Sequence, residues 1–360
     1  MRIFQNSGIY RSYRRRLTRL TRDCDTFAAA IDAFLADRFG AAHFLQPILQ
    51  REEAAFFANG DDEFAQRLWA KEHGMPSNTT LADILRGQIE EHRSDVFYNM
   101  DPMRYGDEFL AKLPGSVRRK IAWRAAPSAG GRYLTHDIIV NNFPTLLDHY
   151  RAQGARTAYF APAHDPAMDA YADRIERPID VLFVGTYSQY HRQRAAMLEA
   201  VAALRDINVV MHLDRSRLTI LAETPIGIVW PFRKHRRAKD VRMVAKGPVF
   251  GLELIDALSQ AKIVVNGAID MSLQDRGNMR VWEAMGTCAA LVSDAGRYPE
   301  HLRAGQEFES YATQEELLVK ISNLLADDPR RRELAKSGFR AVSTHYSKAS
   351  QWEAFMRLAA

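Results

Sequence analysis

The stretch MSLQDRGNMRVWEAMGTCAALVSD, residues 271–294, decides how the C-terminal half of the chain is expected to fold. It begins with the polar loop 274–278, continues through a helix-length segment that carries Glu283, and ends in the apolar run 289–292. The apolar run 262–266 precedes it, so the order is strand, loop, helix, strand, as in a crossover between parallel strands. In such a unit a ligand binds beyond the carboxyl end of the first strand, where the unpaired N–H groups of the next helix favour an anion.

Two carboxylates of this stretch are candidates for chemistry. Asp275 and Glu283 are eight residues apart, which is about 12 Å along a single helix. If Asp275 lies in the loop and Glu283 on the helix, both can face one cleft.

Residues 276–286, RGNMRVWEAMG, followed by an apolar strand, resemble the C-terminal signature of group 1 glycosyltransferases with the GT-B fold. They are most similar to the CgeB-like, or spore-maturation-protein-like, branch, whose pattern is Asn-x-Arg-x-x-Glu-Ala-x-x-x-Gly. Asn278, Arg280, Glu283 and Ala284 are in register, whereas the glycine comes two residues early, at Gly286, and Cys288 stands in its place. The similarity extends over residues 137–352, and the first 130 residues contribute little to it.

The resemblance implies a fold, a domain division and a reaction. The fold is α/β with two Rossmann-like, doubly wound domains that face a cleft. Residues 1–175 are expected to bind the acceptor and residues 176–345 the nucleotide-sugar donor, while residues 346–360 form a helix that crosses back to the first domain. In the family one carboxylate holds the donor ribose and another lies near the donor sugar. By position these roles fall on Glu283 and Asp275, where Asp replaces the usual Glu.

Composition agrees with a two-domain globular protein of this kind. The chain has 360 residues, of which 47% are hydrophobic and 26% charged, and its two cysteines are far apart without metal-ligand spacing. We therefore expect a reducing, cytoplasmic setting. No apolar run is long enough to span a membrane, and the first residues predict a strand rather than a signal peptide. A net charge of +5 favours anionic partners, but no nucleic-acid module is recognisable.

In the N-terminal half, polar residues follow several expected strands. Glycine and amide residues here are candidates for the acceptor side, and two further residues for a catalytic base. The acceptor-side candidates are Gly8, Asn99 and Asn141, and the candidate bases are Asp101 and His164. Residues 26–89 predict mainly helix, with Phe56 and Phe57 on a helix face.

The basic helix expected over residues 10–20 has two interpretations. It is either an ordinary solvated face or a contact with an anionic membrane or a phosphate-bearing acceptor. The triplet Asp23-Cys24-Asp25 has the spelling of a metal-binding Asp-x-Asp motif. It lies in a helical pattern rather than at a strand end, so we interpret it as coincidence.

In the C-terminal half, the apolar run 179–185 ends in Gly185 and is followed by Arg192 and Arg194. Glycine allows a diphosphate to approach the backbone, and arginine neutralises it without a metal. The family also has a loop that contacts the base, which places Gly247 and Val249 in that pocket. Asn278 and Arg280 complete the expected donor set, and a short helix over 298–303 is expected to follow the loop that closes over the donor.

The sequence thus predicts a hexosyltransferase-like enzyme that uses a UDP- or GDP-sugar without an essential metal or other cofactor. Retention at the anomeric carbon is expected, since the spacing of Asp275 and Glu283 resembles retaining families. The acceptor is a glycan, a lipid phosphate or a protein, in keeping with polysaccharide biosynthesis near the inner face of a membrane. Two alternatives stay open, a sugar-nucleotide epimerase and a non-catalytic binding or scaffold protein that retains the fold.

Overall fold

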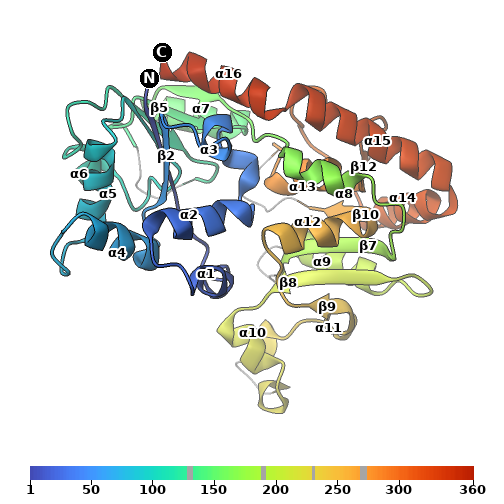
Figure 1. Cartoon of the computed structure of the whole chain (residues 1–360). Helices are drawn as coiled ribbons and strands as arrows, with labels where there is room; N and C mark the ends of the chain where they lie inside the picture. The colour runs from blue at the N-terminus through green and yellow to red at the C-terminus, as the bar shows by residue number, and fades with distance from the viewer. Residues whose placement is uncertain (128–132, 188–191, 229–231, 268–273) are drawn as a thin grey trace. The chain divides into compact units, whose positions relative to one another are not determined.

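The computed structural model describes residues 1–127, 133–187, 192–228, 232–267 and 274–360. It divides into two compact units, one comprising Met1–Pro162 with Lys348–Ala360 and the other Ala163–Ser347. The sequence predicts divisions after residues 175 and 345, whereas the compact units divide after Pro162 and Ser347. Each unit contains a six-stranded sheet whose adjacent strands are parallel, with helices between them (Figure 1). The predicted fold class, two doubly wound α/β domains, is confirmed.

The sheet of the first unit has the strand order β2-β1-β3-β4-β5-β6. The chain starts in the middle of the sheet, adds β2 on one side and then crosses to β3 on the other, so the winding direction changes between β1 and β3. The strands are β1 Ile3–Ser7, β2 Ala55–Asn59, β3 Val96–Asn99, β4 Arg119–Trp123, β5 Ile138–Asn141 and β6 Thr157–Tyr159. The helices are α1 Arg14–Thr21, α2 Phe27–Ala36, η1 Ala41–His43, α3 Gln46–Leu49, α4 Glu63–Glu72, α5 Leu81–Glu91, α6 Asp107–Leu110, α7 Pro144–Ala152 and, from the chain's end, α16 Lys348–Ala359.

The prediction of helix for residues 55–59 is wrong, because this segment forms β2. It pairs in parallel with β1, with Ile3 opposite Ala55. Phe56 stacks on Phe4 and Phe57 on Phe34, so the two adjacent rings are held by different partners, as the alternation of a strand requires. Both rings therefore serve a buried sheet rather than one helix face.

The sheet of the second unit has the order β12-β11-β10-β7-β8-β9, and its winding direction changes between β7 and β10. The strands are β7 Ile179–Thr186, β8 Val209–Asp214, β9 Ala245–Lys246, β10 Ala261–Asn266, β11 Ala290–Asp294 and β12 Glu309–Tyr311. The helices are η2 Pro166–Met168, α8 Asp169–Ala172, α9 Arg192–Ala202, α10 Arg217–Ala222, η3 Pro225–Ile228, η4 Phe232–His235, α11 Lys239–Val244, α12 Leu252–Ser259, α13 Met279–Gly286, α14 Gln314–Ala326 and α15 Asp328–His345.

The helix predicted over residues 298–303 is also wrong, because these residues form turns. His301 has a left-handed backbone with φ of 67°, a conformation that does not continue a right-handed helix. The turns connect β11 to β12.

Helix α16 belongs to the first unit although the second unit lies between them in the sequence. The Nζ of Lys348 donates hydrogen bonds to the carbonyls of Ala41 and Phe44 at 2.6 and 2.7 Å. Phe355 is fully buried and its ring lies 5.1 Å from Tyr98 and 5.9 Å from Phe160. In the parts of the chain that the structure describes, no helix combines the length and apolar character of a membrane span.

Candidate functional site

The candidate site of the second unit lies at the carboxyl ends of β7 and β10, where the winding direction of the sheet changes. Ligands of open α/β sheets bind at this point because the loops that leave the two strands separate there. Three segments named from the sequence contribute to it. They are the end of β7 at Gly185, helix α9 with Arg194, and helix α13 with Arg280 and Glu283.

Arg194 lies directly against Gly185. A Cβ atom added to Gly185 would come within 2.7 Å of the Nη2 of Arg194, so a side chain at residue 185 would displace the guanidinium. The guanidinium carbon lies 5.1 Å from the centre of the Phe183 ring, a cation–π contact. Its Nε is buried without a hydrogen-bond partner among the described residues. Burial, reinforced by the charge of Arg280, lowers the pKa of Arg194.

Helix α13 carries the second cation and a buried carboxylate. Arg280 Nη1 donates to Glu283 at 2.7 Å, and only 8% of Glu283 is exposed. The Nε of Arg280 is buried and has no partner within the described part of the chain. Glu283 is therefore held in a fixed position, which suits a carboxylate that accepts hydrogen bonds from a ligand.

The side chain of Asn278 fixes the start of α13 to the neighbouring strands. It does not cap the helix but exchanges two hydrogen bonds with Asn266, at 3.0 and 3.1 Å. Asn266 also donates to the hydroxyl of Ser293 at 3.0 Å. This chain of amides and a hydroxyl ties the ends of β10 and β11 to the helix N-terminus, whose dipole favours an anion.

Asp275 is buried and paired with a neighbouring loop. Its carboxylate accepts from Arg297 Nε at 2.7 Å and only 1% of the residue is exposed. Arg276 forms a second ion pair with Asp294 at 2.5 Å. Two backbone hydrogen bonds, from the N–H of Arg276 to the carbonyl of Arg297 and from the N–H of Arg297 to the carbonyl of Gln274, join the same loops. The structure thus places Asp275 in a clamp between loops.

The remaining donor-side candidates are placed as follows. Gly247 is exposed and its carbonyl lies 2.7 Å from His212 Nδ1, whereas Val249 is half-buried in the loop before α12. Burial lowers the pKa of His212, with a contribution from the hydrogen bond that acts in the opposite direction. Arg192 begins α9, but its side chain lies outside what the structure describes.

The first unit has a corresponding edge where β1 and β3 end. A Cβ added to Gly8 would lie 3.1 Å from the carboxylate of Asp101, so these two candidates meet. Asn99 is buried and donates to the carbonyl of Tyr105 at 2.8 Å, while its oxygen accepts from the N–H of Asp101 at 3.1 Å. Asn99 therefore shapes the loop that presents Asp101.

Asp61 lies at the same edge and was missed from the sequence, because the strand that it follows was interpreted as helix. Its carboxylate accepts from the N–H of Ile9 at 3.0 Å and pairs with Arg14 at 2.6 Å. Arg104 lies 3.8 Å from Asp61 and 3.2 Å from Asp101, so it links the two acids. Burial raises the pKa of Asp61, and the two arginines oppose this shift. The signal in the sequence is Gly60-Asp61-Asp62, which follows the apolar run 54–58 after one residue, Asn59.

Two candidates of the N-terminal half lie apart from this edge or have structural partners. Asn141 ends β5, and its side chain donates to the carbonyl of Arg124 at 2.6 Å and accepts from the N–H of Phe143 at 2.8 Å. His164 belongs to the second unit, contrary to its expected place in the first. It is 3% exposed, its Nε2 lies 2.7 Å from Asp169, and its ring abuts Gly286 at the C-terminal end of α13. His164 thus lies at the opposite end of that helix from the candidate site.

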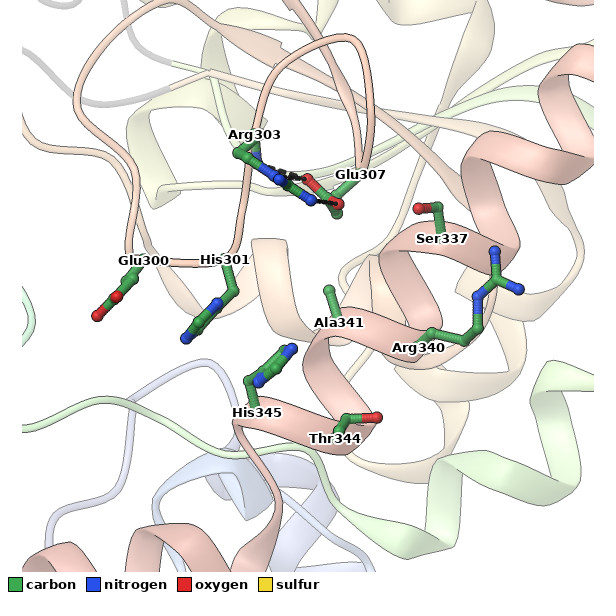
Figure 2. Close-up of a pocket in the computed structure, with 9 residues that line it drawn as sticks. All are labelled: Glu300, His301, Arg303, Glu307, Ser337, Arg340, Ala341, Thr344 and His345. Atoms are coloured by element: carbon green, nitrogen blue, oxygen red, sulfur yellow. Dashed lines mark hydrogen bonds and ion pairs between the residues drawn. The ribbon is translucent and has the colours of Figure 1, made fainter.

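The structure also contains a cavity of about 430 Å³ elsewhere in the second unit (Figure 2). It lies between the turns after β11 and the last part of α15, where the rings of His301 and His345 stack 3.9 Å apart. Arg303 and Glu307 form an ion pair on its wall. Nothing in it corresponds to the donor-site residues. Among the residues that the structure describes, no cluster of three or more His, Cys, Asp or Glu side chains has the arrangement of a metal site.

Known proteins are similar to this chain in sequence over one segment and in fold over its whole length. Residues 190–357, slightly less than half of the chain, match the model of a family described as glycosyl transferase-like. A comparison with curated proteins finds no match.

Three solved structures illustrate the fold. The chain is similar to Anabaena Alr3699/HepE in complex with UDP-glucose, with 13% identity and a TM-score of 0.59 over 99% of this chain and 98% of that chain. It is similar to a glycosyltransferase from Rickettsia africae, with 10% identity and a TM-score of 0.53 over 99% of this chain and 97% of that chain. It is also similar to sucrose-phosphate synthase from Thermosynechococcus elongatus, with 12% identity and a TM-score of 0.52 over 99% of this chain and 98% of that chain. The fold is therefore GT-B, and residues 190–357 match a family described as glycosyl transferase-like.

Proposed function

We propose that the protein transfers a sugar from a nucleoside diphosphate sugar to the hydroxyl of an acceptor. The observation that carries this proposal is the pair Arg194 and Arg280 beside Gly185. Arg194 is a partly buried cation whose Nε has no hydrogen-bond partner among the described residues, and the carboxylate of Asp294 attracts it without forming an ion pair with it. A buried charge without a counter-ion is costly, and a diphosphate would supply the missing negative charge. The complex of the Anabaena neighbour with UDP-glucose supports a UDP-sugar, and a GDP-sugar is the second candidate.

The chemistry follows from these charges. The bond between the anomeric carbon and the diphosphate oxygen breaks, and the oxygen keeps the electron pair. The acceptor oxygen bonds to the anomeric carbon and gives its proton to the departing diphosphate if the configuration is retained, or to the base Asp101 if it is inverted. Arg194, Arg280 and the N-terminus of α13 would stabilise the charge that develops on the diphosphate. We propose that they do so without a metal, and that Glu283 accepts hydrogen bonds from the ribose.

The stereochemistry and the acceptor are further parts of the proposal. Retention is favoured by the resemblance of the Asp275 and Glu283 spacing to retaining families. For an inverting enzyme the candidate base is Asp101, which lies at the edge of the first sheet, rather than His164. The acceptor would be a glycan, a lipid phosphate or a protein and would bind near Gly8. Membership of the CgeB-like branch, a cytoplasmic location and a role in polysaccharide biosynthesis complete the proposal.

Thermal unfolding with a panel of nucleotides tests the donor site. UDP, GDP, ADP, TDP and CMP are added with and without magnesium to the wild type and to Glu283→Ala. At a concentration of one hundred times Kd, a bound nucleotide stabilises the folded protein by about 2.7 kcal/mol. Loss of the ribose hydrogen bonds in Glu283→Ala should weaken binding by about ten- to a hundredfold.

The control is Glu315→Ala, which removes an exposed glutamate of α14 in the same unit. It should bind the nucleotide like the wild type. Equal affinity of Glu283→Ala and the wild type would contradict the role of Glu283. No stabilisation of the wild type by any nucleotide would contradict the proposed donor class and favour the scaffold alternative. Turnover of a sugar nucleotide without acceptor and without release of free nucleotide would identify an epimerase instead.

A further inference from the structure

The chain between β8 and β9 forms a small projection, which we name the basic insert and define as residues 215–228 and 234–239. It contains α10, the turn η3 and the end of η4, and in Figure 1 it extends beyond β8 and β9, at the edge of the sheet. Between Arg215 and Lys239 the sequence has seven Lys or Arg residues and a single acidic residue, Glu223.

Arginine side chains hold the insert in one conformation. Arg236 Nη1 donates to the carbonyls of Ala222 and Thr224 at 2.6 and 3.0 Å. Arg237 is buried and pairs with Glu223 through two contacts, at 2.5 and 2.9 Å. A Cβ at Gly227 would come within 2.2 Å of the Ala222 carbonyl oxygen, so the turn after α10 requires glycine. The only carboxylate of the insert is therefore neutralised internally.

This fixed structure exposes large aliphatic side chains that a water-soluble surface would normally bury. Leu218 is 47% exposed, Ile220 51% and Leu221 38%, all on the six residues of α10. Leu218 and Leu221 are three residues apart and so lie on one face of α10, and Ile220 adds a third exposed side chain beside them. We call these three side chains the aliphatic cluster; exposed apolar surface of this kind marks contacts with a partner or a membrane.

The basic residues around the cluster are available for a partner. Arg215, Arg217, Lys234 and Lys239 are exposed. Arg215 approaches Glu223 only to 3.9 Å, and that carboxylate already has Arg237. The insert therefore presents aliphatic side chains together with an excess of positive charge, which is the combination that binds an anionic bilayer surface.

Helix α1, the other basic segment, differs in this respect. Arg14 pairs with Asp61 at 2.6 Å and Arg16 with Asp37 at 2.5 Å, so two of its arginines stabilise the first unit. Leu17 is 4% exposed. Arg15 and Arg19 remain exposed but have only Leu20, at 36%, as an exposed aliphatic neighbour on the helix.

From this comparison we propose that the basic insert docks the protein on membranes that contain anionic lipid. The aliphatic side chains of α10 enter the boundary between head groups and acyl chains, and the exposed Arg and Lys residues contact lipid phosphates. A protein partner would have to complement both the aliphatic cluster and the surplus of positive charge, whereas an anionic bilayer does so directly. The surface lies outside the donor site, so the inference does not depend on the proposed reaction.

Vesicle sedimentation of the full-length protein tests the proposal. Vesicles of phosphatidylcholine alone are compared with vesicles that contain about 30% phosphatidylserine, whose negative surface potential attracts basic side chains. The wild type should bind only the anionic vesicles. Leu218→Ser/Leu221→Ser leaves the charge unchanged and should weaken binding by at least about tenfold. Arg217→Gln/Lys234→Gln should weaken it by roughly thirtyfold.

The matched control is Arg15→Gln/Arg19→Gln, which removes the same charge from α1 and should retain vesicle binding. Nucleotide binding in solution, measured for every variant, shows that the second unit is folded and separates failure here from failure of the proposed donor site. The proposal is overturned if the wild type does not bind anionic vesicles. It is equally overturned if Arg15→Gln/Arg19→Gln abolishes vesicle binding while the substitutions in the basic insert leave it unchanged. It is also overturned if the leucine variant changes only the oligomeric state, which would make α10 a protein interface.

Discussion

At the scale of single residues, Arg194 offers the sharpest test of the site. The free protein carries the cost of a partly buried cation whose pKa burial lowers. We expect Arg194→Met to unfold at no lower temperature than the wild type without ligand, since it removes that cost. The same substitution should weaken UDP binding by about ten- to a hundredfold, because charge-assisted hydrogen bonds to the diphosphate are lost. Calorimetric titration with UDP and thermal unfolding measure the two effects.

Arg205→Met is the control for this prediction. Arg205 is 59% exposed and pairs with Asp240 at the surface of the same unit, so its loss should change neither quantity appreciably. A large destabilisation of ligand-free Arg194→Met would show that the guanidinium supports the fold rather than a ligand.

A second prediction at this scale concerns the stability that the ion pair between Asp275 and Arg297 contributes. Its carboxylate is 1% exposed and depends on Arg297, whose side chain is 46% exposed. Arg297→Gln would remove the guanidinium that pairs with this buried carboxylate, and we expect the free energy of unfolding to fall by about 2 kcal/mol, less than for a fully buried pair. Asp275→Asn in the same background should recover much of this loss. A double-mutant cycle by chemical denaturation measures the coupling, and additive effects of the two substitutions would contradict the clamp.

The sequence could predict those parts of the candidate site whose residues are close together along the chain. Gly185 with Arg194, and Arg280 with Glu283, lie within one strand-to-helix turn or one helix, so their proximity follows from short-range geometry. The pair Asp275 and Arg297 depends on two loops that meet through backbone hydrogen bonds. Nothing in the sequence around Asp275 indicates that its carboxylate turns to Arg297 rather than to a ligand.

At the scale of elements, His136 connects the end of β3 to the segment before β5. Its Nε2 lies 3.3 Å from the Asn99 amide, and burial lowers its pKa to about 4. The unfolded value is about 6.5, so the unfolded chain binds more protons between these two values. Stability is therefore complete above about pH 6.5 and falls as the pH drops towards 4, by about 3 kcal/mol for this group.

Chemical denaturation at several pH values between about 7 and 4 checks this prediction. His136→Gln should show a shallower loss of stability with acid, while His149→Gln, which changes an exposed histidine of α7, should follow the wild type. Equal slopes for all three proteins would rule out His136 as the group that titrates.

Two elements show why local pattern was insufficient. The segment 55–59 contains Phe56 and Phe57 next to each other, which fits a helix face as well as a buried strand, and the decision comes from pairing with β1 more than fifty residues away. The residue pattern over 298–303 predicts a helix, but the left-handed backbone of His301 is incompatible with one. Long-range pairing and a backbone conformation unusual for a non-glycine residue are both invisible to periodicity.

At the scale of the whole molecule, the first unit is completed by the last helix of the chain. Deleting residues 348–360 would expose the partners of Phe355 and remove the Lys348 ammonium that donates to the carbonyls of Ala41 and Phe44. Loss of one large buried aromatic side chain alone costs about 3–5 kcal/mol, which is comparable to the stability of a domain. We expect a chain that ends at Ser347 to lose the ordered first unit while the second unit still binds UDP.

Scanning calorimetry with and without UDP measures this outcome. The full chain should show a nucleotide-sensitive and a nucleotide-insensitive transition, and only the first should persist after truncation. Full-length Lys348→Met serves as a milder variant that should lower the nucleotide-insensitive transition. Loss of nucleotide binding after truncation would show that the two units do not fold independently. Chain length and the family pattern predict two domains. The boundaries between them depend on contacts between distant residues, such as the hydrogen bond from the His164 N–H to the Tyr346 carbonyl, at 2.7 Å.

The placement of α16 in the first unit also sets an order of events during synthesis on the ribosome. Residues 1–162 emerge before the second unit, whereas the helix that completes their core emerges after it. At about 5–20 residues per second, the segment between Pro162 and Lys348 takes roughly 10–40 s to be translated. During that interval the second unit can fold, while the buried face that α16 will cover stays open to water, chaperones and neighbouring nascent chains. The half of the protein that is made first is therefore expected to be the half that matures last.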